Sequence, residues 1–368
     1  MELQDFKVEV CDIDEILPHP NADRLQLARV KGWQVVIPLN KFKAGDKVVY
    51  IPVDAVLPVE LETKLFPPES KIKLSNSRVR AIKIRQFVSQ GMIETLENVG
   101  LAGNGWKAGD DVTKDLSIAK YEPPVPAFQS AGGQASPASK KKQNPHFVVY
   151  SKFPRIQNYP NMFDENEEVV VTEKIHGTNF RAGWVPFVAN NWWRKALVLL
   201  RIDPKWQFVY GSHYVQLSEK LLYDGYYKKN IYAEIVKRYD LEKRIAKGQV
   251  IYGEIYGAGV QKGYDYGLKE ERDLIIFDIQ ENGKWLAYDN FKAEADSMYI
   301  KTCPVLYRGP MKDSNLEQNM QGASVLAPEQ KVREGCVVKP VVEGGLLPRK
   351  GAKVINPEYL LGDNTDFH

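Results

Sequence analysis

The chain has 368 residues, a length typical of two domains, and its 43% hydrophobic content is ordinary for a globular protein. A net charge of +3 excludes a strongly polycationic protein but is compatible with a local basic groove. Three cysteines without a C-x-x-C pair argue against a disulfide framework or a structural zinc site. The first residues contain no apolar signal segment, and ALVLL at 196–200 is too short to span a bilayer, so we expect a cytoplasmic protein without a membrane partner.

Residues 1–120 carry the pattern of an all-β domain. Short β-branched runs at 32–39 and 46–58 are broken by Gly and Pro, and residues 78–95 alternate charged and apolar side chains. Several short strands with close turn signals predict a small barrel. The alternating basic residues would lie largely on one strand face, which is either a solvated surface or an oligonucleotide-binding surface.

One motif in this region carries a resemblance. HPNADRLQLARV (19–30) is similar to the opening of the oligonucleotide-binding (OB) modules attached to some tRNA-handling enzymes. The same residues also fit a simple turn, formed by Asn21 and Asp23, before a strand.

Residues 121–145 differ in composition from their surroundings. They are rich in Pro, Gly, Ala and Ser and include the lysine run 140–142. Such a stretch cannot bury a core, so it predicts an inter-domain linker. We interpret the lysine run as solvated linker in preference to a phosphate contact.

Residues 146–368 mix strand and helix patterns. Strands are predicted at 167–174, 249–257, 272–280, 334–342 and 352–356, and 180–188 is predicted as the antiparallel partner of the first of them. ENGK (281–284) predicts a hairpin turn. Residues 218–247 have helical character, with Tyr223, Tyr227, Ile231 and Ile235 four apart on a stripe that we assign to the core.

Charged residues recur at the ends of these strands. A single charged residue at a strand end is usually just a solvated charge, and Lys174 considered alone would be interpreted in the same way. Carboxylates and lysines on five strands of one domain instead predict a shared site for a polyanion and a hard divalent cation. The residues are Lys174, Glu254, Asp278, Glu334, Lys339, Lys350 and Lys353.

The order of the motifs makes the resemblance specific. EKIHGTN, YGEIYG, IIFDI, EGCVVKP and KVINPEYL resemble the nucleotidyltransferase motifs of covalent ligases, and they are most similar to the RNA ligase 2-like branch. In that branch the lysine motif carries His where DNA ligases and capping enzymes usually carry Asp. The resemblance covers 146–368 and implies an α+β nucleotidyltransferase (ATP-grasp-like adenylation) domain with antiparallel sheets. It follows a linker at 121–145 and an all-β OB-type barrel at 1–120.

The resemblance also implies roles for individual residues. Lys174 is the expected nucleophile of an ATP-dependent RNA ligase, which joins 3′-OH and 5′-phosphate ends through a lysyl-AMP. Glu254, Asp278 and Glu334 are expected to hold Mg or Mn, and Lys339 and Lys353 to contact the α-phosphate. The expected nucleotide contacts are Glu173, Ile175, His176, Asn179, Phe277, Val337 and Lys350. The catalytic set is Lys174, Glu254, Glu334, Lys339 and Lys353.

Two positions depart from the ligase pattern. His213 stands where a ligase of this kind often offers Arg. The last motif, RKGAKVIN, has no clean K-x-K, so its second basic residue is Lys350, Arg349 or neither. The aromatic and basic insert at 190–206 is either a nucleic-acid clamp or, as we prefer, a hydrophobic cap.

The expected partner is a nicked or broken RNA duplex, bound by a monomer. Two alternatives stay open. One is a DNA ligase or a capping guanylyltransferase on the same scaffold. The other is an RNA-binding protein that has lost catalysis. The filled lysine and carboxylate positions favour the RNA ligase.

Overall fold

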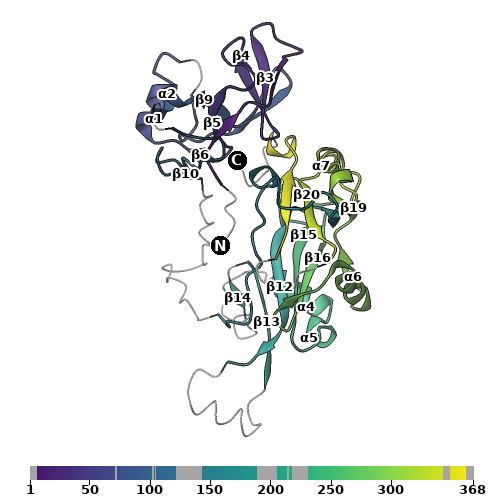
Figure 1. Cartoon of the computed structure of the whole chain (residues 1–368). Helices are drawn as coiled ribbons and strands as arrows, with labels where there is room; N and C mark the ends of the chain where they lie inside the picture. Colours follow the sequence, from purple (N-terminus) through teal and green to yellow (C-terminus); the bar gives the residue numbers. More distant parts are fainter. Residues whose placement is uncertain are drawn as a thin grey trace, which may run out of the picture. The chain divides into compact units, whose positions relative to one another are not determined.

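The computed structural model describes residues 6–70, 73–101, 103, 105–121, 143–188, 205–213, 215–217, 231–342 and 349–361. These residues divide into two compact units, whose elements are labelled in Figure 1. The first unit draws on Met1–Val125, Phe153–Phe163 and Ile355–His368, and the second on Pro126–Lys152 and Asp164–Val354. Segments from beyond the predicted linker therefore pack with the first unit. The linker itself, apart from its ends, and most of the 190–206 insert lie outside the described residues.

The first unit is an assembly of short antiparallel strands, as predicted. It contains two three-stranded sheets, β1-β5-β9 and β2-β3-β4, and the strand pairs β6-β10 and β7-β8. Its elements are β1 (Glu9–Asp12), β2 (Glu15–Pro18), β3 (Leu25–Val30), β4 (Trp33–Pro38), β5 (Lys47–Ile51), β6 (Ala55–Val56), α1 (Val59–Leu65), β7 (Ala81–Ile84), β8 (Phe87–Gln90), β9 (Met92–Thr95), α2 (Leu96–Val99), β10 (Ala119–Lys120) and the short 3₁₀ turns η1 (Ile156–Asn158) and η4 (Tyr359–Leu361).

Strand β5 is central to this unit because both of its faces are buried. Val49 and Ile51 belong to one apolar cluster, whereas Val48 and Tyr50 belong to a second cluster on the opposite face. This follows from the alternation of side chains along a strand. Within the described residues, β4 and β8 belong to different sheets but are linked by side-chain hydrogen bonds. For example, the Val36 amide donates to Ser89 Oγ at 3.1 Å.

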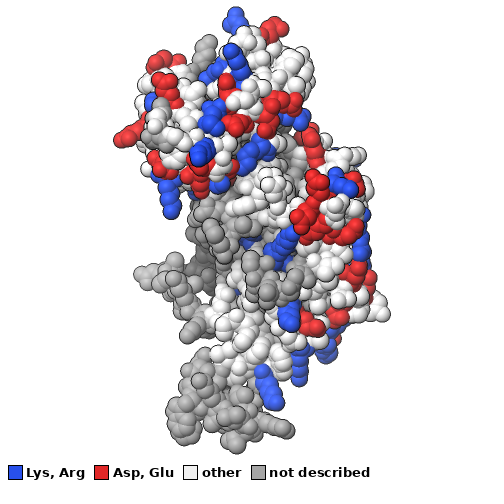
Figure 2. Space-filling view, in the orientation of Figure 1, with Lys and Arg blue, Asp and Glu red and all other residues white. Residues whose placement is uncertain are grey.

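Arg78 does not share an exposed strand face with the other basic residues of 78–85, contrary to expectation, whereas Lys83 and Arg85 are exposed. Arg78 is only 2% exposed and donates to the Asp54 carboxylate at 2.6 Å, while its guanidinium lies over the ring of Tyr121. By contrast, the apolar side chain of Ile82 is 49% exposed. A buried arginine must be paired, and Asp54 provides the partner. On the face of this unit drawn in Figure 2, basic and acidic side chains are interspersed.

The HPNADR motif has a structural role in the first unit. Arg85 and Gln86 both have positive φ (48° and 76°) at the tight turn between β7 and β8. Asn21 Nδ2 donates to the Arg85 carbonyl at 3.1 Å, and the Asn21 amide donates to His19 Nδ1 at 3.1 Å. The motif thus stabilises a turn whose positive φ angles are strained for residues other than glycine.

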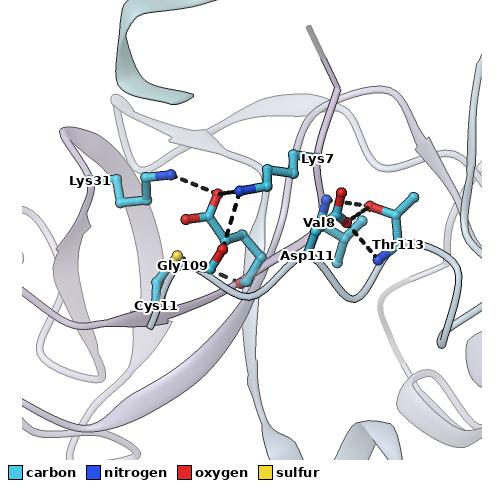
Figure 3. A network of polar contacts seen from close by, with 8 residues as sticks. Lys7, Val8, Cys11, Lys31, Gly109, Asp111 and Thr113 are labelled. Atoms are coloured by element: carbon cyan, nitrogen blue, oxygen red, sulfur yellow. Dashed lines mark hydrogen bonds and ion pairs between the residues drawn. The ribbon is translucent and has the colours of Figure 1, made fainter. Parts of the chain in front are cut away.

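A polar network ties the first strand to its neighbours (Figure 3). The Glu9 carboxylate, 5% exposed, accepts from Lys31 at 2.7 Å and pairs with Lys7 at 3.2 Å. Beside it, the Val8 amide donates to Thr113 Oγ1 at 2.8 Å. Pairing with two lysines compensates the cost of burying the carboxylate.

The second unit contains two antiparallel sheets and several short helices. One sheet has the order β19-β11-β20-β21, and the other has the order β14-β13-β12-β15-β16-β17 with β18 added parallel to β16. Its elements are β11 (Glu168–Glu173), β12 (Thr178–Pro186), β13 (Trp206–Gly211), β14 (Gln216–Leu217), α4 (Ile231–Arg238), α5 (Leu241–Arg244), β15 (Gln249–Gly257), β16 (Arg272–Glu281), β17 (Lys284–Trp285), α6 (Tyr288–Ser297), β18 (Lys301–Thr302), β19 (Val305–Pro310), η3 (Met311–Asp313), α7 (Leu316–Asn319), β20 (Gly335–Pro340) and β21 (Ala352–Ile355).

Strands β11 and β12 are not partners, so the predicted hairpin between them is wrong. Strand β11 pairs with β19 and β20, whereas β12 pairs with β13 and β15. Residues 174–177 therefore carry the chain from one sheet to the other. This crossing places Lys174 between two sheets, which a hairpin would not do.

The core of the second unit lies under the larger sheet, where Phe180, Ile251 and Ile276 pack with residues of the helices. Ile235 of α4 is fully buried, which confirms its assignment to the core stripe, whereas Tyr223 and Tyr227 lie outside the described residues. The ENGK hairpin turn is confirmed: Asn282 and Gly283 both have positive φ between β16 and β17. Within the described ranges, no helix is long and apolar enough to cross a membrane.

Candidate active site

The turn at residues 174–177, here called the lysine turn, begins where β11 ends. The Glu173 amide donates to the Pro304 carbonyl at 2.9 Å, and the Lys174 amide donates to the Gly335 carbonyl at 3.0 Å. The backbone of Lys174 is thereby fixed to the start of β20. Its side chain remains 29% exposed. The structure thus places a lysine with a fixed backbone and a reachable ammonium group at the junction of the two sheets.

Lys174 faces a buried carboxylate. Its Nζ donates to Glu334 Oε1 at 2.6 Å, and Glu334 Oε2 lies 3.7 Å from His176 Nδ1. Burial raises the pKa of Glu334, while the charges of Lys174 and Lys353 oppose that rise. Three predicted site residues, Lys174, His176 and Glu334, therefore lie together, and the charge of Lys353 acts on the same carboxylate.

Glu254 and Asn179 meet on the adjacent sheet. They lie directly opposite each other in the β12–β15 register, so their side chains project from the same face. Both are partly exposed. Gly177 permits this approach: a Cβ at that position would lie 2.2 Å from the Ile255 carbonyl oxygen and 2.8 Å from Glu254 Cγ. The glycine is required by close packing, since its φ is not in the left-handed region.

Asp278 lies in a buried ionic cluster. Its carboxylate is fully buried and accepts from Tyr150 at 2.7 Å, from Lys339 at 3.2 Å, and from Arg349 at 2.8 and 3.0 Å. Lys339 also donates to the Phe277 carbonyl at 2.5 Å. Burial lowers the pKa of Lys339, and Asp278 opposes that shift. The prediction of Asp278 as a metal ligand does not agree with this placement, because both oxygens already serve cations.

The two basic residues of the last motif go to different places. Arg349 joins the Asp278 cluster, whereas Lys350 Nζ pairs with Glu167 at 2.6 Å. Glu167 precedes β11 and Lys174 follows it, so the two ends are roughly 20 Å apart along an extended strand. The structure therefore does not bring Lys350 to Lys174, contrary to its predicted nucleotide contact, and Arg349 is the basic residue of this motif that reaches the cluster.

Of the remaining predicted nucleotide contacts, Glu173 ends β11 and Ile175 belongs to the lysine turn, whereas Phe277 lies on β16 and Val337 on β20. Glu173 Oε2 accepts from the amides of Val325 (2.8 Å) and Leu326 (3.2 Å), while its buried Oε1 has no hydrogen-bond partner among the described residues. Ile175 is buried, whereas Phe277 and Val337 are partly exposed and so present apolar surface. His213, the other departure from the ligase pattern, has its pKa lowered to about 4 by burial and by the charges of Lys152 and Arg181.

Sequence reasoning missed several residues of this region. Tyr150 lies in HFVVYSKFP and was not distinguishable from an ordinary strand or core residue, and its role becomes evident only from its contact with Asp278. Gln261, Tyr264 and Tyr266 lie in YGAGVQKGYDYG (256–267), whose glycines do not have the spacing of a dinucleotide-binding motif. The density of tyrosine and glycine there was the available signal.

Comparison with known proteins gives two family matches. The family described as RNA ligase matches residues 167–355, about half of the chain, and a family described as an OB-fold domain matches residues 7–96. Among curated proteins, the phenylalanine–tRNA ligase beta subunit of Geobacter metallireducens is 37% identical over 100 residues. That match covers 26% of this chain and 10% of the relative, so the chain spans about a tenth of the length of the curated relative it matches.

Solved structures share the fold over nearly the whole chain. Naegleria gruberi RNA ligase with pyrophosphate has a TM-score of 0.68 at 20% identity, covering 97% of this chain and 98% of that one. A variant of the same ligase, solved with ATP and Mn, has a TM-score of 0.69 at 21% identity, covering 96% of this chain and 98% of that one. A further variant, solved with AMP and Mn, has a TM-score of 0.69 at 22% identity, covering 97% of this chain and 98% of that one.

Proposed function

Because the chain belongs to the RNA ligase family and carries an OB-fold domain in front of its ligase domain, we propose that it joins RNA 3′-OH and 5′-phosphate ends at the expense of ATP, with Lys174 as the nucleophile. The observation that carries the proposal is the contact of 2.6 Å between Lys174 Nζ and the buried Glu334 carboxylate, at a turn between two sheets. The ATP and Mn complexes of Naegleria gruberi RNA ligase support the choice of nucleotide.

The proposed reaction has three balanced steps. The neutral Lys174 amine attacks the α-phosphorus of ATP, forming a phosphorus–nitrogen bond as pyrophosphate leaves. A 5′-phosphate oxygen of the RNA then attacks the same phosphorus, so the lysine leaves as an amine that takes up a proton, and an AMP-capped end forms. Finally the 3′-OH attacks the 5′-phosphorus while its proton passes to solvent, and AMP leaves with the electrons of the broken bond. The lysine must lose a proton first, and Glu334 Oε1 lies in hydrogen-bond reach to take it.

Other residues of the second unit fit supporting roles. Lys353 and Lys339 supply positive charge for the α-phosphate, which gains negative charge during the displacement. Glu173 Oε1, which has no hydrogen-bond partner among the described residues, suits an amino group at the adenine edge, and Phe277 and Val337 offer surfaces for the two faces of the base. Ile175, His176 and Asn179 complete the proposed nucleotide contacts.

Glu254 and Glu334 fit a divalent cation, Mg or Mn. Glu334 Oε2 is buried without a hydrogen-bond partner among the described residues, as expected of a carboxylate that faces a cation or its water. In those same residues, no three His, Cys, Asp or Glu side chains form a metal-holding group. That agrees with a hard cation held by one or two carboxylates together with substrate phosphates. When bound, it would neutralise phosphate charge.

We assign Asp278 and Lys350 other roles than those expected from the motifs. Asp278 is the counter-ion that holds Lys339 and Arg349 within the sheet. Lys350 stabilises the start of β11 through Glu167. The OB-fold unit is proposed to hold the RNA, with a nicked or broken duplex as the substrate.

The test is sealing of a nicked duplex in which each strand end is RNA or DNA in turn, with ATP or GTP. We expect ATP-dependent sealing, with at least one nick side required to be RNA, and no sealing by Lys174→Ala. Lys292→Ala is the matched control, because the Lys292 side chain is partly exposed and, among the described residues, forms its ion pair with Asp296 on α6. Sealing with GTP alone, or equal sealing by the Lys174 variant, would contradict the proposal.

A further inference from the structure

The loop that joins β15 to β16 lies against the lysine turn. We name residues 258–268 the tyrosine loop. Gln261 Nε2 donates to the Gly177 carbonyl at 2.8 Å, and the Tyr266 hydroxyl accepts from the His176 amide at 2.8 Å. The Tyr264 ring meets the His176 ring edge-on, with centroids 5.0 Å apart and planes at 87°. Three side chains of one loop thus hold two consecutive residues of the turn.

The loop adopts a conformation that is costly without compensation. Tyr266 has φ +51° although it is not a glycine, and it is only 4% exposed. Bulky residues rarely occupy the left-handed region, and such strain persists where the surrounding structure fixes it. The Tyr266 ring packs edge-on against Tyr256, with centroids 5.5 Å apart. Burial raises the pKa of Tyr266, so its hydroxyl stays protonated and neutral beside the turn.

Together with β20, the loop holds the lysine turn at both ends. The Lys174 amide donates to the Gly335 carbonyl, whereas the His176 amide and the Gly177 carbonyl are held by Tyr266 and Gln261. Removing either side chain would leave a backbone group of the turn without that partner. Because a buried polar group without a hydrogen bond costs free energy, the turn would shift to find another partner. A shift of the turn would displace Lys174 Nζ relative to the bound nucleotide.

We propose that the tyrosine loop is a positioning element that aims Lys174, with Tyr266 and Gln261 as its positioning residues. This inference rests on the proposed function and deepens it. Neither residue takes part in bond making. Because a misplacement of about 1 Å at a reacting centre costs on the order of 100-fold in rate, loss of either contact lowers the rate of AMP attachment without weakening ATP binding.

The test compares Tyr266→Phe with Tyr256→Phe. Each variant removes one buried tyrosine hydroxyl, but Tyr256 donates to Asp273 at 3.2 Å, away from the lysine turn. Single-turnover formation of enzyme–AMP is measured across ATP concentrations with the full chain. We expect Tyr266→Phe to lower the maximal rate by about 10- to 100-fold with an unchanged half-saturating ATP concentration, and Tyr256→Phe to stay within about 3-fold of wild type.

A second variant tests the other contact. Gln261→Glu keeps the shape of the side chain but replaces the N–H donor with a carboxylate oxygen that faces the Gly177 carbonyl. We expect its maximal rate to fall at least as far as that of Tyr266→Phe. Equal rates for Tyr266→Phe and Tyr256→Phe, or a change confined to the half-saturating ATP concentration, would overturn the inference.

Amide hydrogen exchange separates this inference from the proposed function. The His176 amide should be protected in wild type and exchange at least 10-fold faster in Tyr266→Phe, whether or not the protein forms an AMP adduct. Unchanged protection would overturn the positioning role even if the enzyme is an active ligase. An absent adduct in wild type would overturn the proposed function alone.

Discussion

Gly177→Ala tests whether the close approach of β12 to β15 organises the site. The new Cβ would lie 2.2 Å from the Ile255 carbonyl oxygen, whereas a carbon and a carbonyl oxygen rarely come closer than roughly 3.3 Å. The strands must therefore part by about 1 Å, and overpacking of this kind typically costs about 1–3 kcal/mol of stability. Because Glu254 and the lysine turn lie at this contact, we expect enzyme–AMP formation to fall by about 100-fold.

Gly183→Ala is the matched control for that variant. Gly183 lies on β12, the strand that follows Gly177, where a Cβ would meet the Gln249 carbonyl oxygen at the same distance of 2.2 Å, yet it is six residues away from Gly177. Thermal unfolding and the single-turnover rate are measured for both variants well below their unfolding midpoints. We expect similar losses of stability but a rate for Gly183→Ala within about 3-fold of wild type. Equal loss of rate in both variants would refute the reasoning.

Three further changes follow from the charges of the second unit. Glu334→Gln should abolish enzyme–AMP formation. It should nevertheless melt no lower than wild type at pH 7.5, because a carboxyl whose pKa is raised in the folded state makes the protein less stable as the pH rises. A lower melting temperature would contradict this. Burial lowers the pKa of His213 from 6.5 to about 4, so wild type should lose about 1 kcal/mol more stability than His213→Gln as the pH falls from 6.5 toward 4, after allowance for solvent screening; parallel melting curves would contradict it. Lys350→Ala should keep at least a third of the wild-type rate of enzyme–AMP formation, because its ammonium pairs with Glu167, and loss of the adduct would place Lys350 back at the site.

Much of the fold was predictable because its signals are local. The β-branched run at 169–171 and the apolar runs at 250–256 and 274–279 each form a buried strand, and Asn282-Gly283 forms the expected hairpin turn. The order of the motifs further predicted that Lys174, His176 and Glu334 meet. Such features depend on residue type and spacing along the chain, which the sequence displays directly.

The errors concern pairings that depend on distant segments. The partners of β11 are not the next strand but β19 and β20, both of which begin more than 130 residues later, and no local pattern marks that choice. Asp278 has the residue type of a metal ligand, yet Tyr150 and Arg349 arrive from distant segments to occupy its oxygens. The tyrosine loop escaped prediction for the same reason, since its contacts join residues more than 80 positions apart.

Lys174 is the residue that we propose to carry AMP. Mass spectrometry of the protein after incubation with ATP and Mn, without RNA, locates the added AMP on a single peptide. We predict the adduct on Lys174 in wild type, its absence in Lys174→Ala, and its loss from wild type when RNA with a 5′-phosphate is added. AMP on any other residue, or an adduct that persists in Lys174→Ala, would contradict the account.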